Sequence, residues 1–361
     1  MKNIVRQAGI ILGFLGLWYV FFLFLTYFLY PESGVVDNSR MRPHDQYVDN
    51  IFLKDTTSVL LGFWTIKHDT HRIIIIGSST ARVGIHPSVL QTLLPDFTIT
   101  NASVGASTVT QLRQVVDVVR MSSPPSMKGT IFVVVPFYAE FVNGNTPYGH
   151  VLWENKNLTY LQLEALRYGL YKLRDNKVGL TIDPYFMPLA VHLLRPFLLW
   201  DIIFFGMQSY YVDGWLSIYS MMGKHQEELK GEAMKQNALM LWKEGLGNVK
   251  DFGNDAQMDD FIALCQEIAQ SQASLVIVDL PVPPWVRERS EYYRKYILKM
   301  SLYLNEIKKI PRVRYIDLGQ RFSNSTDLDF IDSSHPTKKA AEIWSKTVAD
   351  FIVSQRRFLG F

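Results

Sequence analysis

Four consecutive isoleucines, Ile73 to Ile76, run directly into Gly77. A β-branched run without polar alternation predicts a strand buried on both faces, and such strands belong to parallel sheets covered by helices. Comparable strand patterns occur at 97–101, 129–136, 273–279 and 313–317. Segments with helical periodicity stand between them, at 87–94, 108–121, 256–272, 287–308 and 336–356. This alternation predicts an α/β domain in which a parallel sheet lies between two layers of helices.

A second feature is the apolar N-terminus. Residues 8–30 carry no charge, and this length suffices for a helix to cross the roughly 30 Å of hydrocarbon in a bilayer. Lys2 and Arg6 precede the segment, whereas residues 31–38 contain no Lys or Arg. The positive-inside rule therefore places the N-terminus in the cytoplasm and the following chain outside. Because the segment ends in bulky aromatic residues, residues 1–30 are predicted to be an uncleaved anchor and not a signal peptide.

The remaining chain divides by composition. Residues 31–70 are polar with short apolar patches and are predicted to form a linker or lead-in. The strand and helix alternation occupies residues 71–144 and 256–361, which together form the predicted α/β domain. Residues 145–255 interrupt this alternation, are rich in aromatic residues, and are predicted to be a mostly helical insertion.

The most apolar part of the insertion, residues 185–205, leaves three interpretations open. His192, Arg195 and Asp201 lie within it, as do two prolines. A charge at the centre of a membrane span costs about 3 kcal/mol on insertion scales, which disfavours a second transmembrane helix. A buried pair of helices is favoured, and an apolar face resting on the bilayer or on a membrane partner is the alternative.

Charge and cysteine content exclude several classes of protein. The chain of 361 residues has a formal net charge of +3 and no long run of Lys or Arg, which argues against a nucleic-acid partner. Its one cysteine, Cys265, excludes intramolecular disulfides and is expected to be a buried, inert thiol. His68 and His71 have the spacing of metal ligands, but nothing in the sequence completes a site, so neither a metal nor a cofactor is expected.

Three short segments follow predicted strands directly, at 77–79, 101–107 and 136–140. In parallel sheets, ligand sites lie at the carboxyl ends of the strands, so these residues are expected to meet. The Gly-Ser-Ser motif that ends in Ser79 places a hydroxyl directly after the first strand. On its own, this motif is more often the N-terminal cap of a helix than a catalytic site.

The motif Asp-Ser-Ser-His-Pro precedes the last predicted helix, about 250 residues further along the chain. His335 is predicted to be the base that takes the proton of Ser79, and Asp332 to fix the tautomer of its imidazole. The alternative is again a helix cap. The two motifs at opposite ends of an α/β pattern favour a Ser-His-Asp triad over two unrelated caps.

These blocks resemble the SGNH/GDSL hydrolases, and in particular the membrane-anchored branch of DltD-like and polysaccharide O-acetylation proteins. The resemblance implies a three-layer, flavodoxin-like fold, with Ser79 as nucleophile and Asp332 and His335 as its partners. It also implies an oxyanion hole formed by the N–H groups of Ser79 and Gly105. The third block departs from the family, because Val-Pro-Phe-Tyr at 135–138 replaces the motif that carries the oxyanion asparagine.

Two further residues are weak candidates for binding substrate. Asn143 follows the third block, although an asparagine in a loop is more often a turn residue. Arg82 lies three residues after Ser79 and could hold an anionic group, although a surface ion pair is the more common role.

The expected function is acyl chemistry outside the cell membrane. The residues and the resemblance together predict an extracellular or periplasmic, single-pass O-acyltransferase or acylesterase that acts on a cell-envelope polymer, either teichoic acid or polysaccharide. The resemblance further implies a membrane-bound O-acyltransferase as partner. A non-catalytic SGNH-like scaffold for such a partner, and a plain esterase or lysophospholipase, are the alternatives.

Overall fold

A five-stranded parallel sheet forms the centre of the computed structural model, which describes residues 2–30, 55–66, 71–105, 107–124, 126–142, 160–174, 177–206 and 231–360. The strands are β1 (Arg72–Gly77), β2 (Thr98–Asn101), β3 (Thr130–Val135), β6 (Ser274–Asp279) and β7 (Val313–Asp317). Their order is β2-β1-β3-β6-β7, and every pairing is parallel. This is the order of a doubly wound sheet. Successive strands are added towards one edge from β1 and towards the other edge from β3, so the switch point lies between β1 and β3. The predicted α/β class is therefore confirmed.

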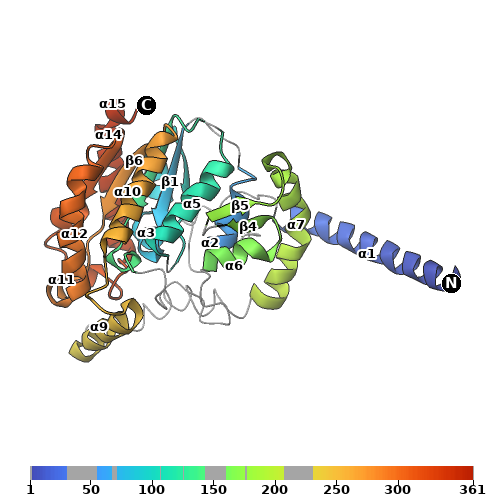
Figure 1. The fold of residues 1–361 in the computed structure, drawn as a ribbon, viewed down its shortest axis with the longest axis horizontal. Helices are drawn as coiled ribbons and strands as arrows, with labels where there is room; N and C mark the ends of the chain where they lie inside the picture. Colours follow the sequence, from blue (N-terminus) through green and yellow to red (C-terminus); the bar gives the residue numbers. More distant parts are fainter. Residues whose placement is uncertain are drawn as a thin grey trace.

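Helices cover both faces of the sheet (Figure 1). On one face lie α5 (Val109–Met121), α10 (Asp255–Gln270) and α12 (Glu291–Ile307), and on the other lie α3 (Ser79–Gly84), α4 (Pro87–Leu93) and α14 (Lys338–Ser354). Successive side chains of a strand point to opposite faces. Accordingly, Ile74 and Ile76 enter the core beside α5, whereas Ile73 and Ile75 enter the core beside α14. The isoleucine run is thus the sequence signature of a strand with two buried faces.

Two of the predicted helices have different boundaries in the structure. The segment predicted as one helix over 287–308 is two helices, α11 (Pro284–Arg289) and α12, because the hydroxyl of Ser290 accepts the N–H of Tyr293 and starts a new helix. The helix predicted over 336–356 corresponds to α14, which does not begin at Pro336. Thr337 caps it, and Pro336 forms a β-bridge with Phe330.

Within the segment predicted as a linker or lead-in, 31–70, the described residues 55–66 are folded against the α/β domain. Residues 55–66 contain α2 (Asp55–Thr57) and the π-helix η2 (Ser58–Gly62), and Leu60, Leu61 and Phe63 are fully buried in the main core. The short apolar patches of this segment are therefore core residues. The segment is also tied to the insertion, since the indole N–H of Trp64 donates to the hydroxyl of Tyr171 at 2.8 Å.

The described part of the insertion is mostly helical, as predicted, but it also contains a hairpin. Its helices are α6 (Tyr160–Arg167), α7 (Met187–Asp201) and α9 (Glu232–Leu246). Strands β4 (Tyr171–Arg174) and β5 (Lys177–Leu180) pair antiparallel in a separate two-stranded sheet. Strands of four residues are too short to be distinguished by their periodicity, and the hairpin was therefore not predicted.

The N-terminal apolar segment is one helix of 28 residues, α1 (Lys2–Leu29), which projects away from the α/β domain (Figure 1). It is long and apolar enough to span a membrane, and Pro184–Phe204 passes the same test of length and composition. Most side chains of α1 are exposed, although Thr26 in its last turn is buried. The predicted N-terminal apolar helix is therefore confirmed.

Gly77 is the residue that lets β1 turn into α3. A Cβ atom at this position would lie 2.7 Å from the carbonyl oxygen of Val135 and 2.4 Å from Cβ of Ala81. Gly77→Ala is therefore expected to destabilise the fold by about 1–3 kcal/mol, because neighbouring backbone must shift to relieve the overlap. Thermal unfolding of the full chain in detergent measures the loss.

Gly84→Ala, at the last residue of α3, is the matched control. Its Cβ would meet Cδ1 of Leu280 at 2.6 Å, and this atom is the end of a side chain that can rotate away. Its melting temperature should fall less than that of Gly77→Ala. An equal fall in both variants would contradict a special role for the approach of Gly77 to β3.

Candidate active site

Ser79 lies at the topological switch point of the sheet, between β1 and β3, where the order of the strands reverses. It is the first residue of α3, directly after β1, and it is half-buried. Ser78 before it has an extended backbone, and its hydroxyl lies 2.9 Å from that of Thr80. The carboxyl ends of β1 and β3 form the crevice in which doubly wound sheets place their ligands. The sheet topology thus brings the serine to the location expected from the sequence.

The Asp332–His335 motif lies in a loop that is closed at its base. The N–H of Ile331 donates to the carbonyl of His335 at 3.0 Å, below the bridge between Phe330 and Pro336. Inside the loop, Oδ1 of Asp332 accepts the backbone N–H groups of Ser334 and His335, both at 2.7 Å. These bonds fix the carboxylate relative to the imidazole before any substrate arrives.

Three side chains from opposite ends of the chain form a linear array. Nε2 of His335 lies 2.9 Å from Oγ of Ser79, and its Nδ1 lies 2.7 Å from Oδ2 of Asp332. The His335 side chain is 13% exposed and that of Asp332 is 33% exposed, so both are partly shielded from solvent. The structure thus brings together the three residues predicted as nucleophile, base and orienting carboxylate, in the arrangement of a Ser-His-Asp triad.

The charge of Asp332 is maintained by its neighbours. Burial raises the pKa of this carboxyl, but the positive charge and hydrogen bond of His335 and the two backbone N–H groups outweigh that effect. The net result is a pKa below the ordinary value for aspartate. Asp332 is therefore ionised at neutral pH, which the role of orienting carboxylate requires.

The second predicted oxyanion donor is not free. The N–H of Gly105 donates to Oδ2 of Asp55 at 3.0 Å, and the other carboxylate oxygen pairs with Arg82. This corrects two predictions together. The predicted oxyanion N–H of Gly105 is occupied by a carboxylate, and Arg82 is a buried partner of Asp55, neither a substrate ligand nor a member of a surface ion pair. The physical reason is the lead-in segment, which folds against the α/β domain and brings Asp55 to the end of β2.

The other sequence candidates contribute less to this site. Asn143 lies outside the described residues, and so does His68. Within the described ranges, no group of three His, Cys, Asp or Glu side chains could hold a metal ion. Cys265 is buried, and burial raises the pKa of its thiol, in agreement with an inert core residue.

Glu140 is a residue near the site whose role the sequence did not reveal. It follows the third block, is fully buried, and accepts the N–H of Phe137 at 3.1 Å. Burial raises the pKa of its carboxyl to about 8, against the opposing effect of hydrogen bonds from Phe137 and Ser78. Glu140 thus contacts Ser78, the residue before Ser79, and its raised pKa favours the protonated acid at neutral pH. The available signal was a glutamate three residues after Phe137, the spacing of a helix capping box.

Glu140 is expected to make the stability of the fold depend on pH. Between pH 4.5 and about 8, the folded chain keeps a proton that the unfolded chain has lost. Stability should therefore fall as pH rises through this window, by up to about 1.4 kcal/mol per pH unit, and Glu140→Gln should remove this slope. Denaturant unfolding of the full chain in detergent, at pH values from 5 to 9, measures the effect.

Asp279→Asn provides the matched control, because burial and the charge of Asp317 raise the pKa of Asp279 to about 7. Asp279 therefore contributes a pH slope of the same sign, and Glu140→Gln should remove a further part of the slope when Asp279→Asn is already present. Equal pH dependence of Asp279→Asn and of the double variant would show that Glu140 is ionised in the folded protein.

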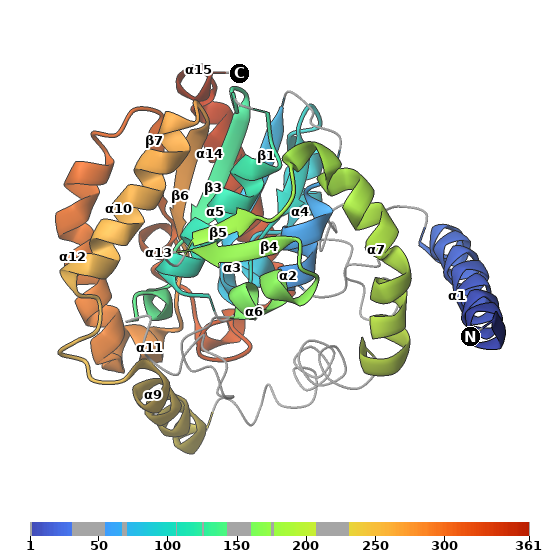
Figure 2. The same ribbon diagram turned by 45° about the vertical axis from the view of Figure 1, so that its right-hand side comes forward.

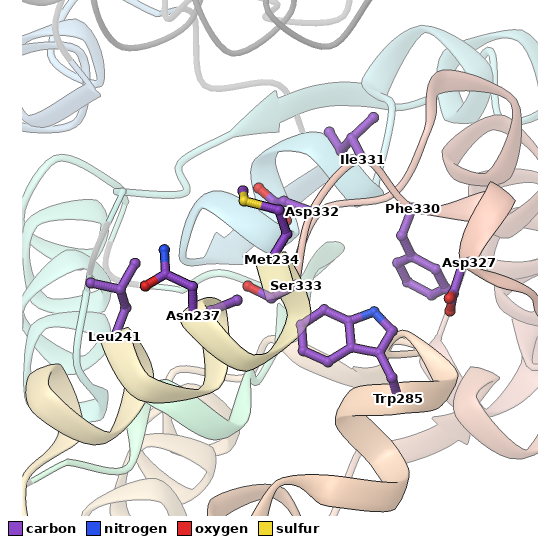
Figure 3. Close-up of a pocket in the computed structure, with 10 residues that line it drawn as sticks. Met234, Asn237, Leu241, Trp285, Asp327, Phe330, Ile331, Asp332 and Ser333 are labelled. Atoms are coloured by element: carbon purple, nitrogen blue, oxygen red, sulfur yellow. The ribbon is translucent and has the colours of Figure 1, made fainter. Parts of the chain in front are cut away.

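A cavity of about 170 Å³ opens beside Asp332 (Figure 3). Its walls come from α9, from Trp285 and from the loop that carries the triad, and its lining residues are Met234, Asn237, Ala238, Leu241, Trp285, Asp327, Phe330, Ile331, Asp332 and Ser333. An apolar cavity of about 150 Å³ accepts benzene, so this cavity suits a group of similar size.

Two contacts hold α9 beside the loop that carries Asp332 and His335. The indole N–H of Trp242 donates to the hydroxyl of Ser333 at 2.9 Å, and Nζ of Lys235 lies 2.5 Å from a carboxylate oxygen of Asp327. A helix from the insertion therefore forms one wall of the site. The sequence assigned the insertion no part in the chemistry.

The chain matches no protein-family model, and no curated protein matches it. The chemical interpretation therefore depends on the geometry of the site and on the motifs that predicted it.

Proposed function

We propose that this protein is a serine-dependent acyltransferase or ester hydrolase of the SGNH type. The observation that carries the proposal is the array in which Oγ of Ser79, the imidazole of His335 and the carboxylate of Asp332 are joined by contacts of 2.9 and 2.7 Å. A free hydroxyl is a poor nucleophile, and this array supplies the adjacent base that activates it. The doubly wound strand order, with Ser79 at the reversal point, supports the same assignment.

The reaction proceeds in two balanced halves. Oγ of Ser79 attacks the carbonyl carbon of an ester while Nε2 of His335 takes the hydroxyl proton, and the carboxylate of Asp332 stabilises the imidazolium. When the tetrahedral intermediate collapses, the ester C–O bond breaks and His335 returns the proton to the departing oxygen. A second hydroxyl, from water or an acceptor, then attacks the acyl-serine by the same route and regenerates Ser79. No cofactor enters either half.

The proposed setting is the outer face of a cell membrane. We take α1 as a single-pass anchor with a cytoplasmic N-terminus and the catalytic domain as extracellular or periplasmic, as the charge distribution indicates. The resemblance to DltD-like proteins favours transfer to a teichoic acid or polysaccharide hydroxyl, with a membrane-bound O-acyltransferase as partner. Retention of α1 is supported by Thr26 and Tyr30 at its end, since both are buried against the domain.

Turnover of an activated acetyl ester by the full chain in detergent tests the proposal. Wild-type protein should release the leaving group, and Ser79→Ala should not. Ser78→Ala is the matched control, because it removes the neighbouring hydroxyl and leaves the triad contacts in place. Faster turnover on addition of a polyol or glycan acceptor would identify a transferase, whereas turnover insensitive to acceptor would identify an esterase.

A second candidate is a non-catalytic scaffold with an SGNH-like fold. The pairing of Gly105 with Asp55 favours it, because one predicted oxyanion donor is already occupied. Folded protein that shows no turnover and no reaction at Ser79 with activated esters would support this candidate over the enzyme.

A further inference from the structure

The outward side of α7 is apolar along its whole length. A row of eight exposed side chains, here called the α7 stripe, runs from the turn before the helix into the π-helix η5 (Ile202–Gly206) after it, and consists of Tyr185, Phe186, Leu189, Leu193, Phe197, Trp200, Ile203 and Phe204. These side chains are 39% to 83% exposed, and most of them are three or four residues apart. Residues at that spacing form one face of a helix. On an ordinary surface helix, polar and charged residues occupy the exposed face, whereas α7 exposes an apolar face.

The polar residues of α7 point away from the stripe and are paired within the protein. Nδ1 of His192 lies 2.9 Å from the hydroxyl of Tyr27 on α1. The carboxylate of Asp201 accepts from Arg167 at 2.7 Å and from the hydroxyl of Tyr168 at 2.8 Å. These residues were the reason to disfavour a second transmembrane helix from the sequence. Because they face the protein, they do not oppose burial of the stripe in lipid.

Arg195 joins α7 to the end of α1. It is fully buried, and its guanidinium donates to the hydroxyl of Thr26 at 3.2 Å, to the carbonyl of Thr26 at 3.0 Å and to the carbonyl of Tyr30. Its carbon Cζ lies 4.2 Å from the centre of the Tyr27 ring. The carbonyl of Thr26 also accepts the backbone N–H of Tyr30 at 2.9 Å, so Arg195 is a second donor to it. The C-terminal end of a helix carries partial negative charge, so a guanidinium there is favourable. The anchor is thus held by the domain at its last turn.

The contact between the two helices continues towards the middle of α1. The hydroxyl of Tyr19 donates to the carbonyl of Leu193 at 2.6 Å, and the rings of Trp18 and Trp200 are 5.2 Å apart. Trp18 precedes the end of α1 by about 11 residues, or about 16 Å at the rise of an α-helix. The stripe is therefore continuous with the exposed apolar surface of α1, and both views place α7 beside the base of α1 (Figure 1 and Figure 2).

We propose that the α7 stripe is embedded in the outer lipid leaflet that α1 crosses, so that α1 and α7 form one rigid membrane unit. The proposal rests on the membrane anchoring by α1 proposed above and does not depend on the chemistry of Ser79. Lipid is the occupant because the stripe continues a surface of α1 that no other described part of the chain covers, and because it carries no charge. The unit would hold the catalytic crevice at a fixed height and orientation above the bilayer.

Depth-dependent fluorescence quenching on the full chain in phosphatidylcholine and phosphatidylglycerol nanodiscs tests this. The single cysteine is buried, so one introduced cysteine can carry an environment-sensitive fluorophore without removing Cys265. Phe197→Cys reports on the stripe, with Leu193→Cys as a second position in case the first fails to fold. Leu12→Cys reports on α1, and Leu302→Cys is an equally exposed apolar control on α12.

Nitroxide groups on the lipid chains should quench the probes at 197 and 12 by about two-fold or more and leave the probe at 302 unchanged, as expected for a helix inserted below the headgroups. Quenching at 12 without quenching at 197 or 193 would overturn the proposal and assign the stripe to a protein partner. No quenching at 12 would show that α1 itself is not in the bilayer, which also overturns it. Ester turnover on the same samples reports separately on the proposed chemistry.

Discussion

His335→Ala is expected to slow the acylation of Ser79 by about 10⁴- to 10⁶-fold. Nε2 of His335 lies 2.9 Å from the Ser79 hydroxyl and is the base that contacts it. Without this base, the hydroxyl must lose its proton to water while it attacks, and the leaving oxygen receives no proton. Single-turnover kinetics with an activated acetyl ester measure the rate of acylation directly.

His71→Ala is the control for this variant. His71 directly precedes β1, at the opposite end of the strand from Ser79, and its ring packs edge-on against Phe97. This variant should acylate at nearly the wild-type rate. A double variant, Ser79→Ala with His335→Ala, should be no slower than either single variant, because the two residues act as a unit. Additive losses would show that they do not.

Asp332→Asn is expected to lower turnover at neutral pH by about 10⁴-fold with little change in the fold. The amide oxygen can still accept the N–H groups of Ser334 and His335, so the loop should keep its shape. The amide group no longer stabilises the imidazolium, and it favours the wrong tautomer of His335. Turnover of an activated ester, with circular dichroism as the check on folding, measures the effect.

Asp327→Asn separates this effect from a general loss of charge. Asp327 lines the same cavity and pairs with Lys235, but none of its hydrogen bonds reaches the triad. Its turnover should change by less than about ten-fold, as expected for a residue that does not stabilise the transition state. Equal losses in both variants would contradict the role given to Asp332.

The pH dependence of turnover carries further information. Because the pKa of Asp332 lies below the ordinary range, its carboxylate stays charged down to acidic pH. A change in turnover between pH 5 and 9 therefore cannot come from titration of Asp332. The pH profile of Asp327→Asn, which retains Asp332, should match that of the wild type. It reports on groups other than Asp332.

The sheet could be predicted from the sequence because its strands are buried on both faces. Runs such as Ile73 to Ile76 leave few alternatives to a covered parallel strand, and polar residues at the strand ends then indicate the site. The order of the strands and the 2.9 Å contact across the chain needed the structure. A motif gives the types of residue, whereas the path of the chain decides which of them meet.

Other features of the site could not be predicted, because they depend on contacts between distant segments. Asp55 reaches Gly105 only because the lead-in is folded into the core, and its polar composition had indicated a linker. Arg195 counted against a second transmembrane helix because a sequence does not show which side of a helix a charge occupies. In the structure, Arg195 faces α1 and the apolar side chains face outward. In both cases, composition did not show which part of the protein the residues contact.

The most direct test of the central claim is the intact mass of the full chain after treatment with a fluorophosphonate. The account predicts one covalent adduct on wild-type protein, located by peptide mapping on Ser79 and absent from Ser79→Ala and His335→Ala. Folded wild-type protein that forms no adduct, or an adduct that persists in Ser79→Ala, would contradict an activated Ser79.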